Sequence, residues 1–209
     1  MPRLLFIEAS PRGGRSSSTA VAARLIERLV ATQPELEVDH LALWDEALPE
    51  FDGATLAAKY ARLAGQPHDA AQAEAWAVIE RMVARLAVAD HVVIATPMWN
   101  FSIPYRLKHY IDLVTQPGLS FTFDPATGYS PLLAPRPLHI VLSSAGDYRF
   151  GPSRGRPDLA TPYLAAALDF IGLSDPVFVP VGPTIGAPDE VAEGHARALR
   201  QVDLVGGEG

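Results

Sequence analysis

The sequence predicts a doubly wound α/β fold, in which helices cover both faces of a five-stranded parallel sheet. Five short apolar segments alternate with longer amphipathic segments along the 209 residues, which is typical of strand–helix–strand units. The third apolar segment, residues 91–95, is rich in β-branched residues and does not alternate with polar ones, which indicates a strand buried on both faces. Right-handed crossovers then favour the strand order 2-1-3-4-5.

The other strands are expected where short extended runs precede loops. They are predicted over residues 3–8, 37–43, 137–143 and 176–181. We expect the central strand to stop at Thr96 and Pro97, since proline cannot donate to a sheet ladder. Alternating residues around a turn at 124–128 predict a small β-hairpin outside the sheet, over about 118–130. Nothing else interrupts the pattern, so the chain is expected to form one domain over residues 1–209.

Amphipathic spacing places helices between these strands. The helix after the first strand carries Val21, Leu25 and Leu29 on one face. Another is expected to begin near Pro104, where a missing N–H group costs nothing at the first helical position. The remaining helices are predicted over residues 53–63, 69–86, 161–171 and 190–202. Residues 206–209, which are rich in glycine, are expected to be a frayed tail.

Composition excludes several classes of function. The chain is 48% hydrophobic and 20% charged, as globular proteins are, and no segment approaches the roughly 18 apolar residues of a transmembrane helix. It has no cysteine, so disulfides and thiol chemistry are excluded, and its 6 histidines lack metal-ligand spacing. The net charge of −7 argues against nucleic-acid binding. We therefore expect a soluble, cytoplasmic protein with no metal, membrane or nucleic-acid partner.

A loop rich in serine and glycine follows the first strand and precedes a helix. It contains Ser10, Ser16, Ser17 and Ser18. Exposed amide groups and the positive end of the helix dipole favour an anion there, and the hydroxyl groups add donors. The loop matches neither the Walker A pattern nor the dinucleotide fingerprint. An ordinary serine N-cap is the alternative, but four serines favour a phosphate site.

The loop after the central strand is apolar and aromatic, where a surface turn is normally polar. It contains Pro97, Met98, Trp99, Asn100 and Phe101. Loops at the carboxyl end of a buried strand bind ligands in open α/β sheets, and a flat aromatic ligand would suit this one. The alternative is that Met98, Trp99 and Phe101 only cap the core.

The loop after the fourth strand completes the predicted site. It contains Ser144, Ala145, Gly146 and Asp147. In the strand order 2-1-3-4-5 the loops after strands one, three and four surround one crevice. A phosphate at the first loop and a planar ring at the other two describe a flavin mononucleotide, FMN.

With these motifs the chain resembles the FMN-dependent NADH-azoreductases, which also act as NADH:quinone oxidoreductases and have the flavodoxin-like fold. The resemblance rests on the serine loop and on the central aromatic loop with the Leu107-Lys108 pair that follows it. It continues through residues 157–159, 161–164 and 170–172, and extends over residues 4–186.

The resemblance implies a role for each predicted site residue. Ser10, Ser16, Ser17 and Ser18 would hold the FMN phosphate. The aromatic loop would line the isoalloxazine, with the Asn100 amide near flavin N5, and residues 144–147 would face the pyrimidine edge. The family usually has a second glycine where this chain has Asp147, and a carboxylate pointing inward there would disfavour the anionic reduced flavin.

The resemblance also implies a ping-pong reaction in a homodimer. NADH would deliver a hydride to flavin N5 and leave, and a quinone or an aromatic azo compound would then take two electrons. The cofactor carries this chemistry, so no catalytic side chain is named. Both subunits shape the substrate pocket in the family, and a rim around Phe121, Phe123 and Phe150 would suit that arrangement. These aromatic residues could equally pack the hairpin against its own domain.

Three other interpretations remain open at this stage. Residues 151–155 match the G-x-S-x-G pattern of serine hydrolases, but Ser153 lies in a polar loop without the strand and helix that the motif needs. A flavodoxin-like electron carrier, or a related NAD(P)H-dependent chromate or nitro reductase, would share the flavin site. Arg149, Arg154 and Arg156 could select NADPH by binding its 2′-phosphate, or could have no such role.

Overall fold

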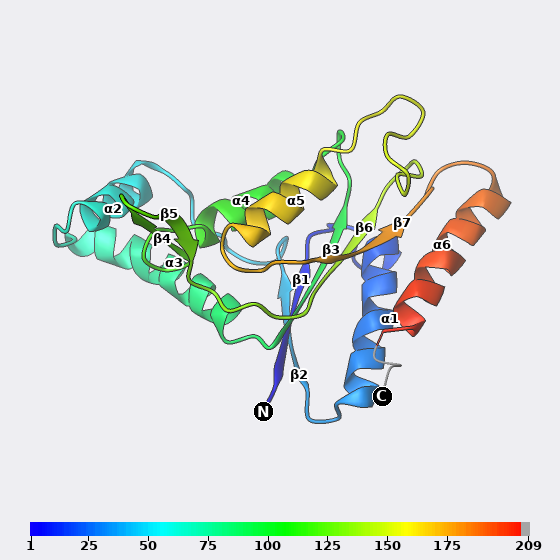
Figure 1. The fold of residues 1–209 in the computed structure, drawn as a ribbon, viewed down its shortest axis with the longest axis horizontal. Coiled ribbons are helices and arrows are strands. Elements are labelled where there is room, and N and C mark those ends of the chain that lie inside the picture. Colours follow the sequence, from blue (N-terminus) through cyan, green and yellow to red (C-terminus); the bar gives the residue numbers. More distant parts are fainter. Residues whose placement is uncertain (206–209) are drawn as a thin grey trace.

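A computed structural model describes residues 1–205 and shows a five-stranded parallel sheet in the order β2-β1-β3-β6-β7 (Figure 1). The strands are β1 Arg3–Glu8, β2 Glu37–Ala42, β3 His91–Pro97, β6 Leu138–Ser143 and β7 Val177–Val181. This is the predicted order, because the two hairpin strands take the labels β4 and β5 between the third and fourth strands of the sheet. The tail predicted over residues 206–209 lies outside the described part of the chain.

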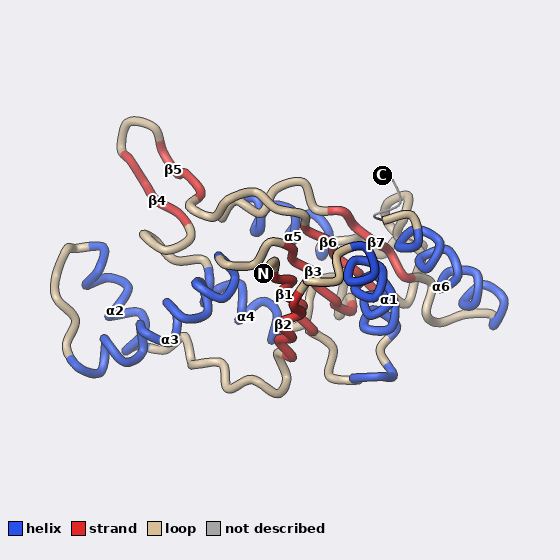
Figure 2. Tube along the Cα trace, turned by 90° about the horizontal axis from the view of Figure 1, so that it is seen from below, coloured by secondary structure: helices blue, strands red, loops and turns tan. Residues whose placement is uncertain are grey.

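Helices cover both faces of the sheet, as predicted (Figure 2). They are α1 Ser17–Thr32, α2 Gly53–Leu63, α3 Ala70–Ala87, α4 Tyr105–Val114, α5 Ala160–Asp169 and α6 Pro188–Asp203, with a short 3-10 turn at Gly13–Arg15. Helices α1 and α6 pack on one face, and α3, α4 and α5 pack on the other, with α2 against α3. No helix within residues 1–205 is long and apolar enough to span a membrane.

Two apolar cores lie on either side of the sheet because its central strands are buried on both faces. In β1, Leu5 and Ile7 join the core under α3, α4 and α5, whereas Leu4 and Phe6 join the core under α1 and α6. All six residues of β6 are buried. This explains the continuous apolar runs in the sequence.

The central strand is longer than predicted. We expected the apolar strand over residues 91–95 to stop at Thr96 and Pro97, but both residues pair with β6, Pro97 opposite Ser143. The amide of Met98 donates to the Ser143 carbonyl at 2.7 Å, so the ladder resumes directly after the residue that cannot donate. The helix expected to begin near Pro104 begins one residue later, because Pro104 is the N-cap of α4.

The hairpin predicted near residues 118–130 is present as β4 Phe121–Asp124 paired with β5 Gly128–Pro131. It stands outside the main sheet, on the side of the molecule that carries α2 and α3 (Figure 1). Phe121 and Tyr129 of the hairpin contact Phe170, with ring centroids 4.8 and 5.5 Å away. The hairpin is therefore held to the domain by aromatic packing at the end of α5.

Two histidines on neighbouring strands lie on the face of the sheet covered by α1 and α6. His139 of β6 is buried beside Val93 of β3, and His91 lies two residues before Val93. The Nδ1 atoms of both histidines have no hydrogen-bond partner among residues 1–205. Burial lowers the pKa of each imidazole, and the pKa of His139 is lowered further by the charge of His91.

These shifts predict that the protein loses stability in mild acid. Below a pKa of about 6.5 the histidines of the unfolded chain bind protons, whereas the buried imidazoles do not. The free energy of unfolding should therefore be constant above about pH 7.5 and fall below about pH 6.5, by up to about 1.4 kcal/mol per pH unit for His139. Urea denaturation of His139→Leu should show a shallower decline than that of the wild-type chain. Equal pH profiles for the variant and the wild-type chain would contradict the assignment.

Candidate functional site

Three loops meet where the parallel strands β1, β3 and β6 end. Backbone hydrogen bonds connect them, because Ala9 donates to the Ala95 carbonyl at 2.9 Å and Met98 donates to the Ser143 carbonyl at 2.7 Å. The Ser144 amide in turn donates to the Val181 carbonyl of β7 at 3.0 Å. The structure thus brings together the serine loop, the aromatic loop and the loop that begins at Ser144.

The serine loop forms the N-terminus of α1. Ser16 is the N-cap, and its Oγ accepts from the Thr19 amide at 3.3 Å and lies 3.1 Å from Ser18 Oγ. Ser10, Ser16 and Ser18 are buried, and Ser17 is half-buried. The first amides of a helix have no acceptor within it, so those of Ser17 and Ser18 are available for an anion. Capping and anion binding are therefore compatible here, although the sequence presented them as alternatives.

A buried carboxylate under this loop was not anticipated from the sequence. Glu8, the last residue of β1, accepts from Thr19 Oγ1 at 3.0 Å and lies 3.0 Å from His40 Nε2. It holds the first turn of α1 against the ends of β1 and β2. The only indication in the sequence was a charged residue directly after the four apolar residues of the strand.

The aromatic loop is a tight turn with an unusual backbone. Trp99 and Ser102 exchange two backbone hydrogen bonds of 2.8 and 3.0 Å, and the residues between them, Asn100 and Phe101, have φ angles of 48° and 72°. Asparagine tolerates this left-handed region, but for phenylalanine it is a strained conformation that costs of order 1 kcal/mol. Strain of this kind gathers at ligand sites. The Phe101 carbonyl accepts from the Leu159 amide at 2.9 Å, which ties the turn to the start of α5.

The side chains of this loop divide between the core and the surface. Met98 packs against the buried core, as the alternative interpretation expected. Trp99 and Phe101 are 37% and 41% exposed, so they do not simply cap the core. Trp99 also stands 5.9 Å from the ring of Trp44. An aromatic surface is therefore left open at the carboxyl end of the central strand.

The loop after β6 is held by its own backbone and by the segment after β7. Ser144 Oγ donates to the Gly146 carbonyl at 2.8 Å, and the Ser144 carbonyl accepts from both the amide and the hydroxyl of Thr184. Asp147 pairs with Arg149 at 2.6 Å and lies 3.8 Å from Arg197. Hydrogen bonds from the Arg149 guanidinium hold the pKa of Asp147 below its usual range.

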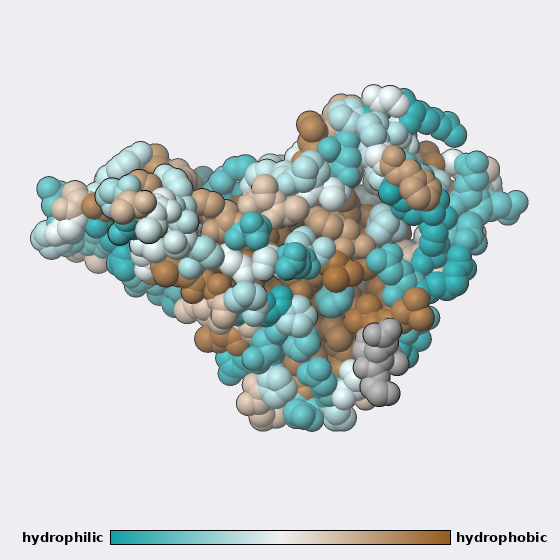
Figure 3. Space-filling model, in the orientation of Figure 1, coloured by the Kyte–Doolittle hydropathy of each residue, from teal (hydrophilic) through white to brown (hydrophobic). Residues whose placement is uncertain are grey.

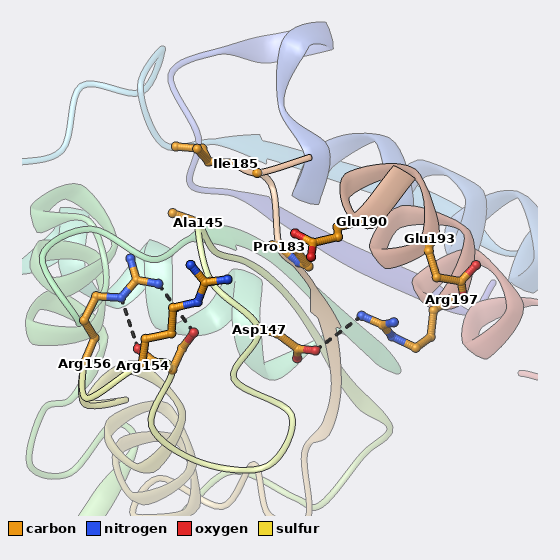
Figure 4. A pocket seen from close by; sticks show the side chains of 12 residues that line it. Ala145, Asp147, Arg154, Arg156, Pro183, Ile185, Glu190, Glu193 and Arg197 are labelled. Carbon is orange, nitrogen blue, oxygen red and sulfur yellow. Dashed lines mark hydrogen bonds and ion pairs between the residues drawn. The ribbon is translucent and has the colours of Figure 1, made fainter. Parts of the chain in front are cut away.

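Asp147 is thus a paired carboxylate at the wall of a neighbouring cavity (Figure 4). Its negative charge is largely balanced by Arg149 and Arg197. The sequence raised the case of a carboxylate pointing inward toward the flavin, and the structure adds that this carboxylate is paired with Arg149.

The structure does not bring Phe121, Phe123 and Phe150 together within one chain. Phe121 and Phe123 belong to the hairpin, whereas Phe150 lies on the segment between β6 and α5, on the other side of α5 (Figure 1). Phe150 is 90% exposed, and the Arg149 guanidinium lies 4.8 Å from its ring centroid. The packing of Phe121 on Phe170 follows the other expectation, that hairpin aromatics contact their own domain.

Ser153 lacks the surroundings of a hydrolase nucleophile. It begins a tight turn closed by two backbone hydrogen bonds with Arg156, each of 3.0 Å. No strand directly precedes it, and α5 begins only at Ala160. Its hydroxyl lies 3.4 Å from the Arg156 guanidinium, which cannot act as a base. The motif is therefore a turn that shares a pattern with those enzymes.

Comparison with known proteins agrees with this geometry. Residues 2–204 match the family model described as "Flavodoxin-like fold". The chain is 46% identical over 202 residues to FMN-dependent NADH:quinone oxidoreductase 1 of Bradyrhizobium diazoefficiens, with 97% of each chain covered. It is 44% identical over 204 residues to FMN-dependent NADH:quinone oxidoreductase of Ruegeria pomeroyi, with 95% of this chain and 97% of that one covered.

Solved structures give the same result for the fold. An azoreductase from Bacillus anthracis superimposes with a TM-score of 0.88 at 25% identity, with 98% of both chains covered. An FMN-dependent NADH-azoreductase from the same species, solved in complex with FMN, gives a TM-score of 0.83 at 22% identity, with 97% of this chain and 98% of that one covered.

The strain at Phe101 predicts that glycine is more stable than valine at this position, which is the reverse of the order at an unstrained position. Glycine adopts a φ of 72° without penalty, whereas a β-branched residue is disfavoured there more strongly than phenylalanine. Phe101→Gly should therefore unfold at a higher urea concentration than Phe101→Val, by a difference of about 1–2 kcal/mol in the free energy of unfolding. The same pair of substitutions at exposed Phe150, where φ is not positive, should give the reverse order. Matching orders at the two positions would show that the Phe101 backbone is not strained.

Proposed function

We propose that this chain, which belongs to the flavodoxin-like family of FMN-dependent NADH:quinone oxidoreductases, binds FMN across its three converging loops and reduces quinones and aromatic azo compounds with electrons from NADH. One observation carries the proposal. A helix N-terminus rich in buried serines and a strained, exposed aromatic turn lie side by side at the carboxyl edge of one parallel sheet. This pairs an anion site with a surface for a planar ring, in a chain nearly half identical to oxidoreductases of this name.

The serine loop fits the phosphate of FMN. Ser16 and Ser18 present hydroxyl groups next to the free amides of Ser17 and Ser18, at the positive end of the α1 dipole. Ser10 is buried at the end of β1, and its Oγ accepts from the Arg12 amide at 3.4 Å. We assign the phosphate to Ser10, Ser16, Ser17 and Ser18. Glu8, which is bonded to Thr19 and His40, would fix the start of α1.

The other two loops fit the flavin ring. We assign its flanks to the Pro97, Met98, Trp99, Asn100 and Phe101 loop, and its pyrimidine edge to the Ser144, Ala145, Gly146 and Asp147 loop. Bound FMN would supply two-electron chemistry, accepting from NADH and giving to the quinone or azo compound. The chain itself would hold the phosphate, orient the ring through backbone groups of a rigid turn and exclude water with Trp99 and Phe101. No side chain is assigned to proton transfer.

Purified protein should therefore carry flavin or take it up. Added NADH should bleach the flavin absorbance without oxygen, and a quinone or azo dye should restore it. Initial rates with both substrates varied should give the parallel double-reciprocal lines of a ping-pong reaction. Flavin that binds but is not reduced by NADH would instead indicate an electron carrier. A protein that cannot bind FMN would contradict the proposal altogether.

A matched pair of variants separates flavin binding from helix capping. Ser16→Ala should weaken FMN binding about tenfold or more, since it removes a hydrogen bond to a charged phosphate. Asp52→Ala removes the N-cap of α2, which accepts from the Thr55 amide at 3.0 Å, at a similar cost of about 1 kcal/mol in stability. It should leave FMN affinity unchanged, as measured by fluorescence titration. Equal FMN affinities for the two variants would remove Ser16 from the assigned phosphate site.

We further propose that the protein is a homodimer joined through the hairpin side of the molecule. Phe123, Tyr129 and Leu132 are each about half or more exposed, next to Phe170 at the end of α5. Further apolar surface extends across the middle of the face in Figure 3. A cluster of exposed aromatic residues is typical of protein–protein contact.

The dimer proposal predicts that charge on the hairpin separates the subunits. Phe123→Glu should lower the sedimentation coefficient from that of a dimer to that of a monomer at micromolar concentration, because a carboxylate would be buried in the apolar contact. Phe150→Glu, a still more exposed position away from the hairpin, serves as the control and should remain dimeric. A wild-type chain that sediments as a monomer would contradict the proposal.

A further inference from the structure

A cavity of about 340 Å³ lies at the three-loop edge, between the loop after β6 and the start of α6 (Figure 4). Its volume is within the usual range for small-molecule pockets. One wall is formed by Ala145 and Gly146, and a second is the turn formed by residues 153–156, called here the arginine turn. The opposite wall carries Glu190, Glu193 and Arg197 of α6.

The arginine turn is a built structure rather than a loose loop. Ser153 and Arg156 close it with two backbone hydrogen bonds, and Arg154 and Gly155 between them have φ angles of 51° and 79°. It packs directly on Gly146, where an added Cβ would collide with Ser153 Oγ and the Arg156 guanidinium. The turn is therefore docked against the same loop that we assign to the flavin edge.

The guanidinium groups of this turn are not neutralised by acidic side chains. Arg156 donates to the Ser153 carbonyl at 3.1 Å, and neither Arg154 nor Arg156 forms an ion pair within residues 1–205. Figure 4 shows both side chains on one side of the cavity, facing α6 across it. Two unpaired guanidinium groups at a cavity wall are suited to bind an oxyanion.

The acidic residues of the cavity are mostly engaged elsewhere. Asp147 pairs with Arg149 and lies 3.8 Å from Arg197, and Glu193 pairs with Arg200. Among the described residues, Glu190 is the one lining carboxylate with no ion-pair partner. The cavity therefore has a positive wall at the arginine turn and a single free acceptor opposite to it.

We propose that this cavity binds the phosphate-bearing adenosine half of the nicotinamide donor, with Arg154 and Arg156 on a phosphate group and Glu190 on a ribose hydroxyl. A ligand that carries an oxyanion at one end and hydroxyl donors near it matches both walls. Carboxylates and arginines perform these two tasks in other dinucleotide sites. The inference rests on the proposed function, and it places the donor against Gly146, within the loop assigned to the pyrimidine edge of the flavin.

The nicotinamide donor has two kinds of phosphate group that the arginine turn could bind in the same way. The pyrophosphate is present in NADH and NADPH alike, whereas the 2′-phosphate is present only in NADPH. Adenosine 5′-diphosphate, adenosine 2′,5′-bisphosphate and adenosine itself are the probes that distinguish these sources.

Calorimetric titration of the full chain tests the site directly and does not depend on bound flavin. One or both phosphorylated probes should bind and adenosine should not. Arg154→Ala should weaken that binding about tenfold or more, whereas Arg24→Ala, an equal change in net charge on α1, should have no effect. Tighter binding of the 2′,5′-bisphosphate assigns the 2′-phosphate to the turn, and tighter binding of the 5′-diphosphate assigns the diphosphate. Glu190→Gln removes the free negative charge but keeps an acceptor, so phosphate binding should tighten.

The proposal is overturned if neither phosphorylated probe binds, or if Arg154→Ala and Arg24→Ala bind the probes with equal affinity. Stopped-flow measurements provide a second test, since the two half-reactions are separate. Arg154→Ala should slow flavin reduction at low donor concentration and leave reoxidation by uncharged naphthoquinone unchanged. If the only defect were slower reoxidation by a sulfonated naphthoquinone, the turn would bind the sulfonate group of the acceptor. That result would also overturn the proposal. Failure of the proposed function would be seen separately from failure of this inference, because the protein would then not bind FMN, or NADH would not bleach its absorbance.

Discussion

Parallel pairing of five strands is the constraint on which the rest of this molecule depends. It forces the chain to leave the sheet at one edge after every strand, and so gathers loops that are about 130 residues apart in the sequence. The ladder itself sets their spacing, since Met98 hydrogen-bonds to Ser143 and Ala9 to Ala95. The serine helix cap, the aromatic turn and the loop around Gly146 are consequently fixed relative to one another by main-chain bonds. A site with this support needs little from its side chains to stay in place.

Much of the fold could be predicted because burial leaves a pattern in the sequence. Strands β1, β3 and β6 are buried on both faces, so they appear as uninterrupted apolar runs, and the helices that cover them show one apolar face. The end of β3 was predicted wrongly for a local reason. The absent N–H group of Pro97 interrupts donation at one position only, and Met98 continues the ladder.

The details of the site were less predictable because they depend on contacts between distant residues. Glu8 meets His40 from the next strand, and Asp147 meets Arg197 from the last helix, pairings that no local pattern encodes. The left-handed backbone at Phe101 contradicts the preference of phenylalanine, and only tertiary packing supports it. The location of the three loops followed from topology, whereas the direction of each side chain within them did not.

Because Gly146 packs closely against the arginine turn, substitutions in these two parts of the chain depend on each other, both in evolution and in protein engineering. A side chain at position 146 would push away Ser153 and Arg156, so this packing of the turn goes with glycine at that position. Transplanting the turn into a related scaffold therefore requires moving two separate segments together, because neither is compatible with an arbitrary version of the other.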